Sequence, residues 1–75
     1  MEKYKNLSGN SGVAAYEIGT DSITVEFHDG AVYLYNYQTN GQDNIEQMKK
    51  LAIAGKGLNS FITQNIGKAY AAKLR

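Results

Sequence analysis

The sequence predicts a single α+β domain, with a three-stranded antiparallel β-meander followed by two short C-terminal helices packed on one face of the sheet. Three observations lead to this prediction. Apolar and polar residues alternate from Ile23 to His28, which is the pattern of a half-buried strand. An Asp29-Gly30 pair follows directly, and such a pair typically closes a β-hairpin. Apolar residues then recur at helical spacing in two later segments.

The meander is expected to span residues 13–37. Its first strand is Val13–Ile18, and the turn cluster GTDS joins it to the second strand, Ile23–His28. The third strand follows Gly30 and has the letters AVYLYNY. With a four-residue first turn, the expected cross-strand neighbours are Ile18 and Ile23, Tyr16 and Val25, and Ala14 and Phe27.

Both predicted helices carry a stripe of apolar residues that needs a partner surface, and the sheet offers one. The stripes consist of Ile45, Met48, Leu51 and Ala52 in the first helix and of Leu58, Phe61, Ile62 and Ile66 in the second. Asp43 is the expected N-cap of the first helix, with Glu46 three residues later as in a capping box. Gly55 is expected to end the first helix and Gly67 the second.

Length and composition restrict the function. The 75 residues make one domain, expected at residues 13–70, with a flexible lead-in at 1–12 and a tail at 71–75. Cysteine is absent and there is a single histidine, so no metal or other cofactor is expected. No apolar run reaches the roughly 18 residues of a membrane span, and no signal peptide is recognisable. We therefore expect a cytoplasmic protein without membrane contact.

Charge is distributed unevenly along the chain. Residues 1–46 hold all seven acidic residues and two lysines, whereas residues 47–75 hold no acid and six basic residues. This asymmetry favours a negatively charged partner. No catalytic constellation accompanies it, because His28 has neither a second histidine nor a neighbouring Ser or Cys nucleophile. We therefore expect no enzyme activity.

The hairpin at Asp29-Gly30 allows two registers with opposite consequences for the tyrosines that follow. A two-residue loop places two aliphatic residues in the core and turns Tyr33 and Tyr35 to the open face. A three-residue loop, with Gly30 left-handed in a bulge, shifts the pairing by one residue and turns both rings inward. The local sequence alone leaves both registers open.

The segment ITVEFHDGAVYLY, with its Y-x-Y at Tyr33 and Tyr35, resembles the KTSC family. This small domain occurs alone in bacterial and phage proteins and at the C-terminus of some lysyl-tRNA synthetases. The likeness spans roughly Val13 to Tyr70, and a looser second signature comprises Gly57, Asn59, Phe61, Ile66 and Lys68. The resemblance implies a structural role for the motif residues Gly30, Tyr33, Tyr35, Asn59 and Phe61. The family has no established function, and RNA binding has been suggested because of the synthetase association.

Two departures from the family pattern bear on this resemblance. Family members usually carry a proline soon after the Y-x-Y and often a serine before the later glycine, whereas this chain reads NYQTNGQ and AGKG. The residue between the tyrosines is frequently basic in the family but is Leu34 here. A position that accepts arginine is expected to face solvent. The resemblance therefore favours the bulged register, with Tyr33 and Tyr35 inward.

Two candidate sites for an anionic partner lie in the basic half. The candidate nucleic-acid surface comprises Lys56, Lys68, Tyr70, Lys73 and Arg75. Cations there follow phosphates and the ring stacks on a base, whereas the plainer interpretation is a solvated charged face. The candidate anion or phosphate site comprises Gly55, Lys56 and Gly57. Its plainer interpretation is a turn between two helices.

We therefore expect a small non-enzymatic module that binds RNA or another nucleic acid weakly through its basic C-terminal half. The alternative is a protein-interaction or homodimerisation module, with another protein as the partner. In the bulged register, the residues expected on the uncovered sheet face are Val13, Ala15, Val32 and Leu34. Together they make an apolar patch that a partner sheet can cover.

Overall fold

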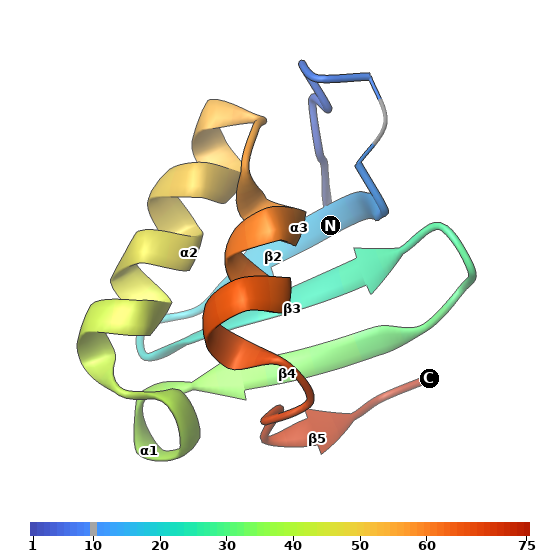
Figure 1. Ribbon diagram of the computed structural model, residues 1–75. Helices are drawn as coiled ribbons and strands as arrows, with labels where there is room; N and C mark the ends of the chain where they lie inside the picture. Colours follow the sequence, from blue (N-terminus) through green and yellow to red (C-terminus); the bar gives the residue numbers. More distant parts are fainter. Residues whose placement is uncertain (10) are drawn as a thin grey trace.

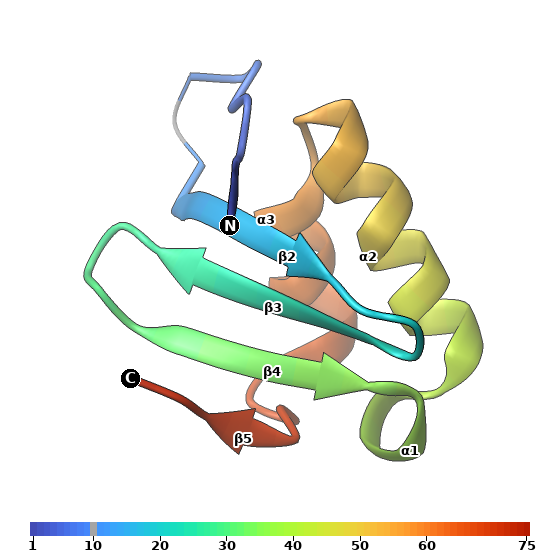
Figure 2. The same cartoon turned by 180° about the vertical axis from the view of Figure 1, so that it is seen from behind.

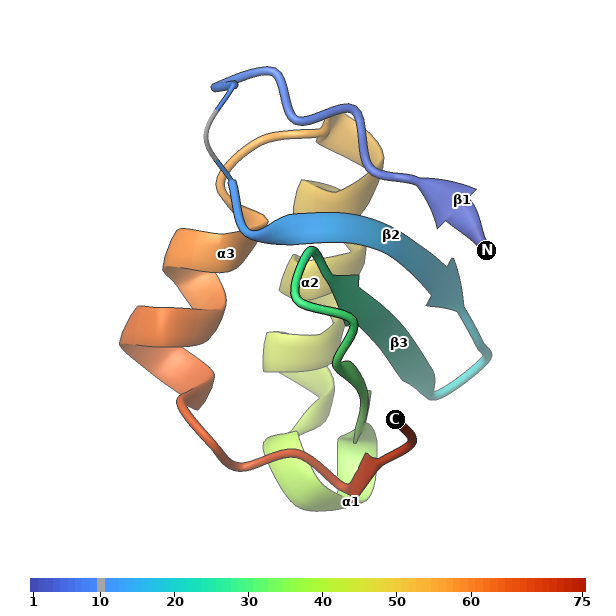
Figure 3. The ribbon, with the colours of Figure 1, turned by 90° about the vertical axis from the view of Figure 1, so that its right-hand side faces the viewer.

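The computed structural model describes residues 1–9 and 11–75. These residues form two layers, an antiparallel sheet and a layer of helices on one of its faces (Figures 1 and 3). The strands are β1 (Glu2–Lys3), β2 (Val13–Ile18), β3 (Ser22–Phe27), β4 (Val32–Asn36) and β5 (Ala72–Lys73). The helices are α1 (Tyr37–Asn40), α2 (Gln42–Ala54) and α3 (Leu58–Phe61), which continues into a π-helical turn, η1 (Ile62–Ile66). No helix from this part of the chain covers the opposite face of the sheet (Figure 2).

The described part of the sheet has five strands in the order β1-β2-β3-β4-β5, not the three predicted. The predicted meander forms its centre. β1 pairs with β2 at Lys3 and Ala15, and β5 pairs with β4 at Ala72 and Leu34. Each added strand has only two residues, too few to produce a recognisable alternation. Such short edge strands also leave little edge for unwanted pairing with another chain.

The predicted lead-in and tail therefore both contribute to the domain. In the lead-in, Tyr4 is 2% exposed and its hydroxyl accepts a hydrogen bond from the Leu58 N–H at 3.3 Å. The Leu7 N–H donates to the Gly55 carbonyl at 2.7 Å. Asn10, which the predicted lead-in also included, lies outside the described residues. The N-terminal segment thus packs against the connection between α2 and α3.

The β3–β4 hairpin adopts the bulged register. Val25 pairs with Tyr33 and Ile23 with Tyr35. The Phe27 N–H donates to the Ala31 carbonyl at 2.9 Å, and Gly30 has a φ of 94°. This is a three-residue loop with a left-handed glycine, a conformation that costs glycine little. The inward orientation favoured by the resemblance is confirmed for Tyr35, which is 2% exposed, and Tyr33 lies half-buried on the same face.

A second bulge corrects the predicted face of Val13. The register of β2 against β3 shifts between Val13 and Ala15, so that Val13, not Ala14, lies opposite Phe27. Because one extra residue reverses the alternation of side chains, Val13 turns toward the helices and is fully buried. It does not belong to the uncovered face, where the sequence placed it. The other predicted neighbours, Tyr16 with Val25 and Ile18 with Ile23, are confirmed.

The helices enclose one hydrophobic core against the inner face of the sheet. The prediction of Asp43 as the N-cap of α2 is wrong: α2 begins two residues earlier, with Gly41 at its N-cap. Asp43 lies in the first turn, where its carboxylate interacts favourably with the helix dipole. Gly55 ends α2 in the left-handed conformation, as predicted. The short helix α1 was not predicted, and the Asn36 side chain caps it by accepting from the Thr39 N–H. The core comprises Tyr4, Val13, Ile23, Val25, Tyr35, Ile45, Met48, Ala52, Leu58, Ile62 and Ile66.

Candidate functional site

An open groove lies between the β3–β4 hairpin, the helical segment α3–η1 and the C-terminal segment. It has a volume of about 490 Å³, within the range of roughly 300–1,000 Å³ that small-molecule sites occupy. The residues that line this aromatic groove are Phe27, Tyr33, Tyr35, Asn59, Ile62, Thr63, Gly67, Lys68 and Tyr70. The groove therefore combines four aromatic rings with a cation and a few polar side chains.

The fold supplies these residues from two directions. Tyr33 and Tyr35 reach the groove because the bulged hairpin turns them to the helical side of the sheet. Asn59 and Thr63 reach it because residues four apart lie on one face of a helix. Gly67 reaches it at the C-terminal end of η1. The Gly67 N–H donates to the Ile62 carbonyl at 2.6 Å, five residues back, which closes the π-helical turn at the groove. Wide helical turns of this kind are frequent at functional sites.

The sequence predicted only part of this lining. Phe27, Thr63 and Gly67 were not singled out as site residues. The spacing of four between Asn59 and Thr63 is the signal that points to a shared helical face. Phe27 is the inward residue next to the bulge, so its position depends on the same register that the sequence left open.

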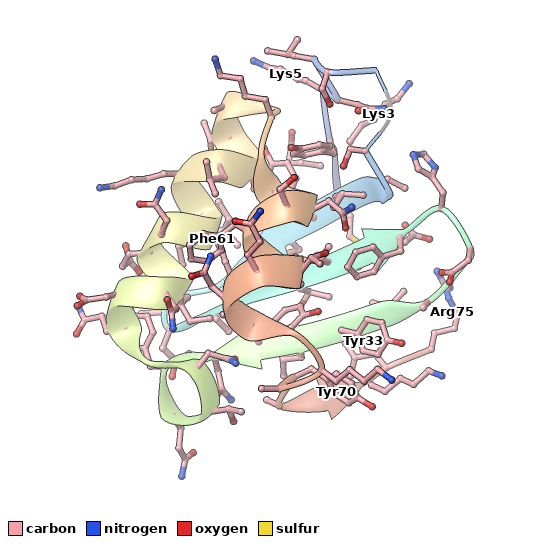
Figure 4. All side chains as sticks on the ribbon, in the orientation of Figure 1. Lys3, Lys5, Tyr33, Phe61, Tyr70 and Arg75 are labelled. Carbon is pink, nitrogen blue, oxygen red and sulfur yellow. The ribbon has the colours of Figure 1, made fainter. Side chains whose placement is uncertain are left out.

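The rings form a stacked cluster that reaches the surface. Tyr33 and Tyr70 have ring centroids 4.6 Å apart and planes inclined by 37° (Figure 4). Phe27 meets Tyr33 edge-on at 5.8 Å. Tyr70 is 37% exposed, whereas Tyr33 is half-buried. The cluster thus offers solvent an aromatic surface whose inner part is held by packing against the core.

The backbone holds Tyr70 in place. The Ala69 N–H donates to the Ile66 carbonyl at 3.1 Å, and the Asn40 side-chain amide donates to the Ala69 carbonyl. On the other side, the Ala71 N–H donates to the Leu34 carbonyl at 2.7 Å. Tyr70 therefore sits between two anchored residues, and its ring covers Tyr33.

The electrostatic environment of the groove favours an anion. Lys68 lines it, and the Lys73 Nζ lies 6.0 Å from the centre of the Tyr33 ring. No acidic side chain lines the groove in the part of the chain that the structure describes. Burial and the neighbouring hydroxyls of Tyr33 and Tyr70 raise the pKa of Tyr35 to about 12. The Tyr35 hydroxyl therefore stays neutral at physiological pH and adds no negative charge.

The five residues of the predicted nucleic-acid surface do not all meet. Lys68, Tyr70 and Lys73 lie at the aromatic groove. The Arg75 guanidinium forms an ion pair with Glu26 at 2.9 Å, on the outer face of the sheet. Lys56 lies in the α2–α3 connection, at the opposite end of the molecule from β5 (Figures 1 and 3). Three of the five predicted residues therefore lie at the groove.

The glycines of the predicted anion site form the connection between α2 and α3. The Gly55 N–H donates to the carbonyls of Leu51 and Ala52, and the Leu58 N–H donates to the Tyr4 hydroxyl. A Cβ at Gly55 would lie 2.6 Å from the Cβ of Lys5, so the backbone there is closely covered. Gly57 is also left-handed, with a φ of 81°. These contacts explain both glycines by the conformation that the α2–α3 connection requires.

Two other surfaces offer a ligand fewer free contacts than the groove does. The uncovered sheet face keeps Ala15, Val32 and Leu34, but Val32 is only 4% exposed and the Glu26–Arg75 ion pair crosses the same face. At α1 and α2, the Tyr37 hydroxyl donates to Glu46 at 2.5 Å, and Lys49 lies 3.0 Å from the same carboxylate. These hydrogen bonds raise the pKa of Tyr37 and lower that of Glu46. The polar groups of Tyr37, Glu46 and Lys49 therefore bond to one another.

Among the other motif residues, Phe61 packs half-buried against the core and Gly30 forms the hairpin bulge. Within residues 1–9 and 11–75, no helix has the length and apolar character needed to cross a bilayer, and no group of three metal-ligating side chains is present. Comparison with known proteins gave no match, since no protein-family model, no curated protein and no solved structure matches the chain.

Proposed function

We propose that this chain is a small non-enzymatic module that binds single-stranded RNA weakly in the aromatic groove. The observation that carries the proposal is the Tyr33–Tyr70 stack, which reaches the surface between Lys68 and Lys73. An aromatic surface with adjacent cations is the combination by which proteins hold single strands. The bases stack on the rings, and the cations follow the phosphates.

The energies are consistent with weak binding. Stacking of one base on an aromatic side chain contributes about 1–3 kcal/mol, and each lysine adds a contact whose strength falls with salt. The groove has a volume of about 490 Å³, and two of its rings stack on each other, so it has room for only one or two bases. A base paired in a duplex has both faces covered by its neighbours, which is why the proposal names single strands.

The resemblance to the KTSC family supports the same site. Its Y-x-Y tyrosines and the more distant Asn59 and Lys68 all line one groove, although 24 residues separate Tyr35 from Asn59. Membership of that family, for which RNA binding has been suggested, is part of the proposal. Asn59 and Lys68, two of the five residues of the second signature, thus lie beside the Y-x-Y tyrosines, which supports a shared role in binding.

Neutralising both groove lysines, by Lys68→Gln and Lys73→Gln, is expected to reduce the salt dependence of RNA binding. For single strands the slope of log K against log salt changes by about 0.7 for each phosphate contact, so the double variant loses up to about 1.4. Between about 50 and 200 mM salt, those two contacts amount to roughly a sevenfold change in affinity. Fluorescence anisotropy with a short labelled RNA at both salt concentrations measures this slope.

The matched control is Lys50→Gln, which removes an exposed lysine on α2 away from the groove. Its slope should equal that of the unmodified protein. An equal loss of slope in Lys50→Gln would mean that binding depends on overall charge and not on the groove. Absence of RNA binding even at low salt would refute the proposed function.

A further inference from the structure

Asn59 stands apart from the other asparagines that the structure describes. Five of them use their side chains in hydrogen bonds within the protein: Asn6, Asn36, Asn40, Asn44 and Asn65. The Asn59 amide makes no hydrogen bond to any described residue. Polar groups that are partly buried are usually paired. Toward residues 1–9 and 11–75, this half-buried amide therefore keeps its donor and its acceptor available for water or a ligand.

The Asn59 amide lies between the groove and the N-terminal segment. Asn59 lines the aromatic groove and also a small polar pocket of about 70 Å³ beside it, formed with Ser8, Ser11, Gly57 and Ser60. A Cβ at Gly12 would lie 3.7 Å from both the Asn59 Nδ2 and Oδ1 atoms, so the amide packs against the Gly12 backbone. The amide is thus supported on one side and open to the groove on the other.

We infer that Asn59 is the residue that gives the groove a preference among RNA bases. This inference rests on the proposed function. A base that stacks on the exposed face of Tyr70 lies parallel to that ring, and Asn59 lines the same groove. The Asn59 amide would then meet the edge of the base. An amide presents a donor and an acceptor side by side, which matches the adjacent donor and acceptor atoms on the edge of an unpaired base. The lysines, in contrast, hold any sequence equally.

Because the amide discriminates between bases and the lysines do not, substitutions of Asn59 and of the lysines should have different effects. A good bidentate pair discriminates between bases by about 1–3 kcal/mol, which is roughly a 5- to 150-fold difference in affinity. Removing the amide should therefore remove preference while leaving the salt slope unchanged. Removing a lysine should weaken binding to all sequences by a similar factor. The polar residue Thr63 also lines the groove, but a single hydroxyl cannot make a bidentate pair.

The test compares the affinities of oligo(A), oligo(C) and oligo(U) RNAs of equal length for the unmodified protein and Asn59→Ala. The unmodified protein is expected to bind one of the three at least fivefold more tightly than the weakest, and Asn59→Ala is expected to bind all three within about twofold. Asn65→Ala is the matched control, because its side chain bonds to the Phe61 carbonyl on the exposed helix surface. It should retain the full preference.

Asn59→Asp provides a second variant that keeps the size and shape of the side chain, should Asn59→Ala fold poorly. It loses the donor and cannot form the same donor–acceptor pair, so the preference shown by the unmodified protein should be lost. A preference that survives in the folded Asn59 variants, or an unmodified protein that binds all three RNAs equally, would overturn the inference while leaving the proposed function intact. Failure of all three RNAs to bind the unmodified protein at low salt would instead refute the proposed function.

Discussion

Replacing Tyr4 by alanine is expected to lower the free energy of unfolding by about 3–5 kcal/mol, the usual cost of removing a buried aromatic ring. Tyr4 is 2% exposed and belongs to the core. A domain of this size is expected to have a stability of only about 5 kcal/mol or somewhat less. The single substitution should therefore unfold a large share of the molecules at room temperature. Urea denaturation followed by circular dichroism measures the change.

Two further variants separate the contributions at this position. Tyr4→Phe keeps the ring and loses the hydroxyl that accepts from the Leu58 N–H, so it should cost only about 1 kcal/mol. Leu7→Ala changes a residue of the same segment that is 65% exposed and should cost less than about 0.5 kcal/mol. If Tyr4→Ala were as stable as Leu7→Ala, the N-terminal segment would not be part of the folded core.

Replacing Tyr70 by alanine is expected to weaken binding of single-stranded RNA by roughly 5- to 150-fold, which corresponds to the loss of about 1–3 kcal/mol of stacking. Tyr70 forms the exposed half of the stack with Tyr33. Because its ring is partly exposed, the substitution should leave the fold intact. Anisotropy titration at low salt measures the affinity, and thermal unfolding checks the fold.

Tyr70→Phe keeps the ring and should retain most of the affinity. Leu74→Ala removes a side chain of the same C-terminal segment that is 56% exposed and does not line the groove, so its affinity should be unchanged. Unchanged binding by Tyr70→Ala would show that the bases do not stack on this ring. The site would then have to lie elsewhere.

The central strands and both long helical segments could be predicted because their side chains follow a clear period. The alternation from Ile23 to His28 and the helical spacing after Asp43 each extend over several residues. The edge strands β1 and β5 could not be found in this way, since two residues show no period. Their positions depend on hydrogen bonds to strands that are far away in the sequence.

The faces of the sheet were harder to predict than its strands. The hairpin register depends on whether the loop has two or three residues, and a left-handed Gly30 fits both loops. The bulge between Val13 and Ala15 has no sequence signal of its own, yet it moves Val13 from the outer face into the core. In each case one extra residue in one strand decides which side chains are buried.

The positive charge of the candidate site could be predicted, but the set of residues that line it could not. Lys68 and Lys73 follow from the basic composition of the second half, and Tyr70 is the aromatic residue between them in the sequence. Their separation from Lys56 and Arg75 depends on where the chain turns, which composition does not record. Phe27 joins the groove only because the hairpin brings it beside Tyr33. The groove is therefore a product of tertiary packing between the hairpin and the helix.

Amide chemical shifts of isotope-labelled protein, followed during titration with a short single-stranded RNA at low salt, test the proposed groove most directly. The largest changes are expected at residues that line the groove, above all Tyr33, Asn59, Lys68 and Tyr70. The α2–α3 connection at Lys56 and the outer face of the sheet should change little. Shifts centred on either of those regions, or none at all, would contradict the assignment of RNA binding to the groove.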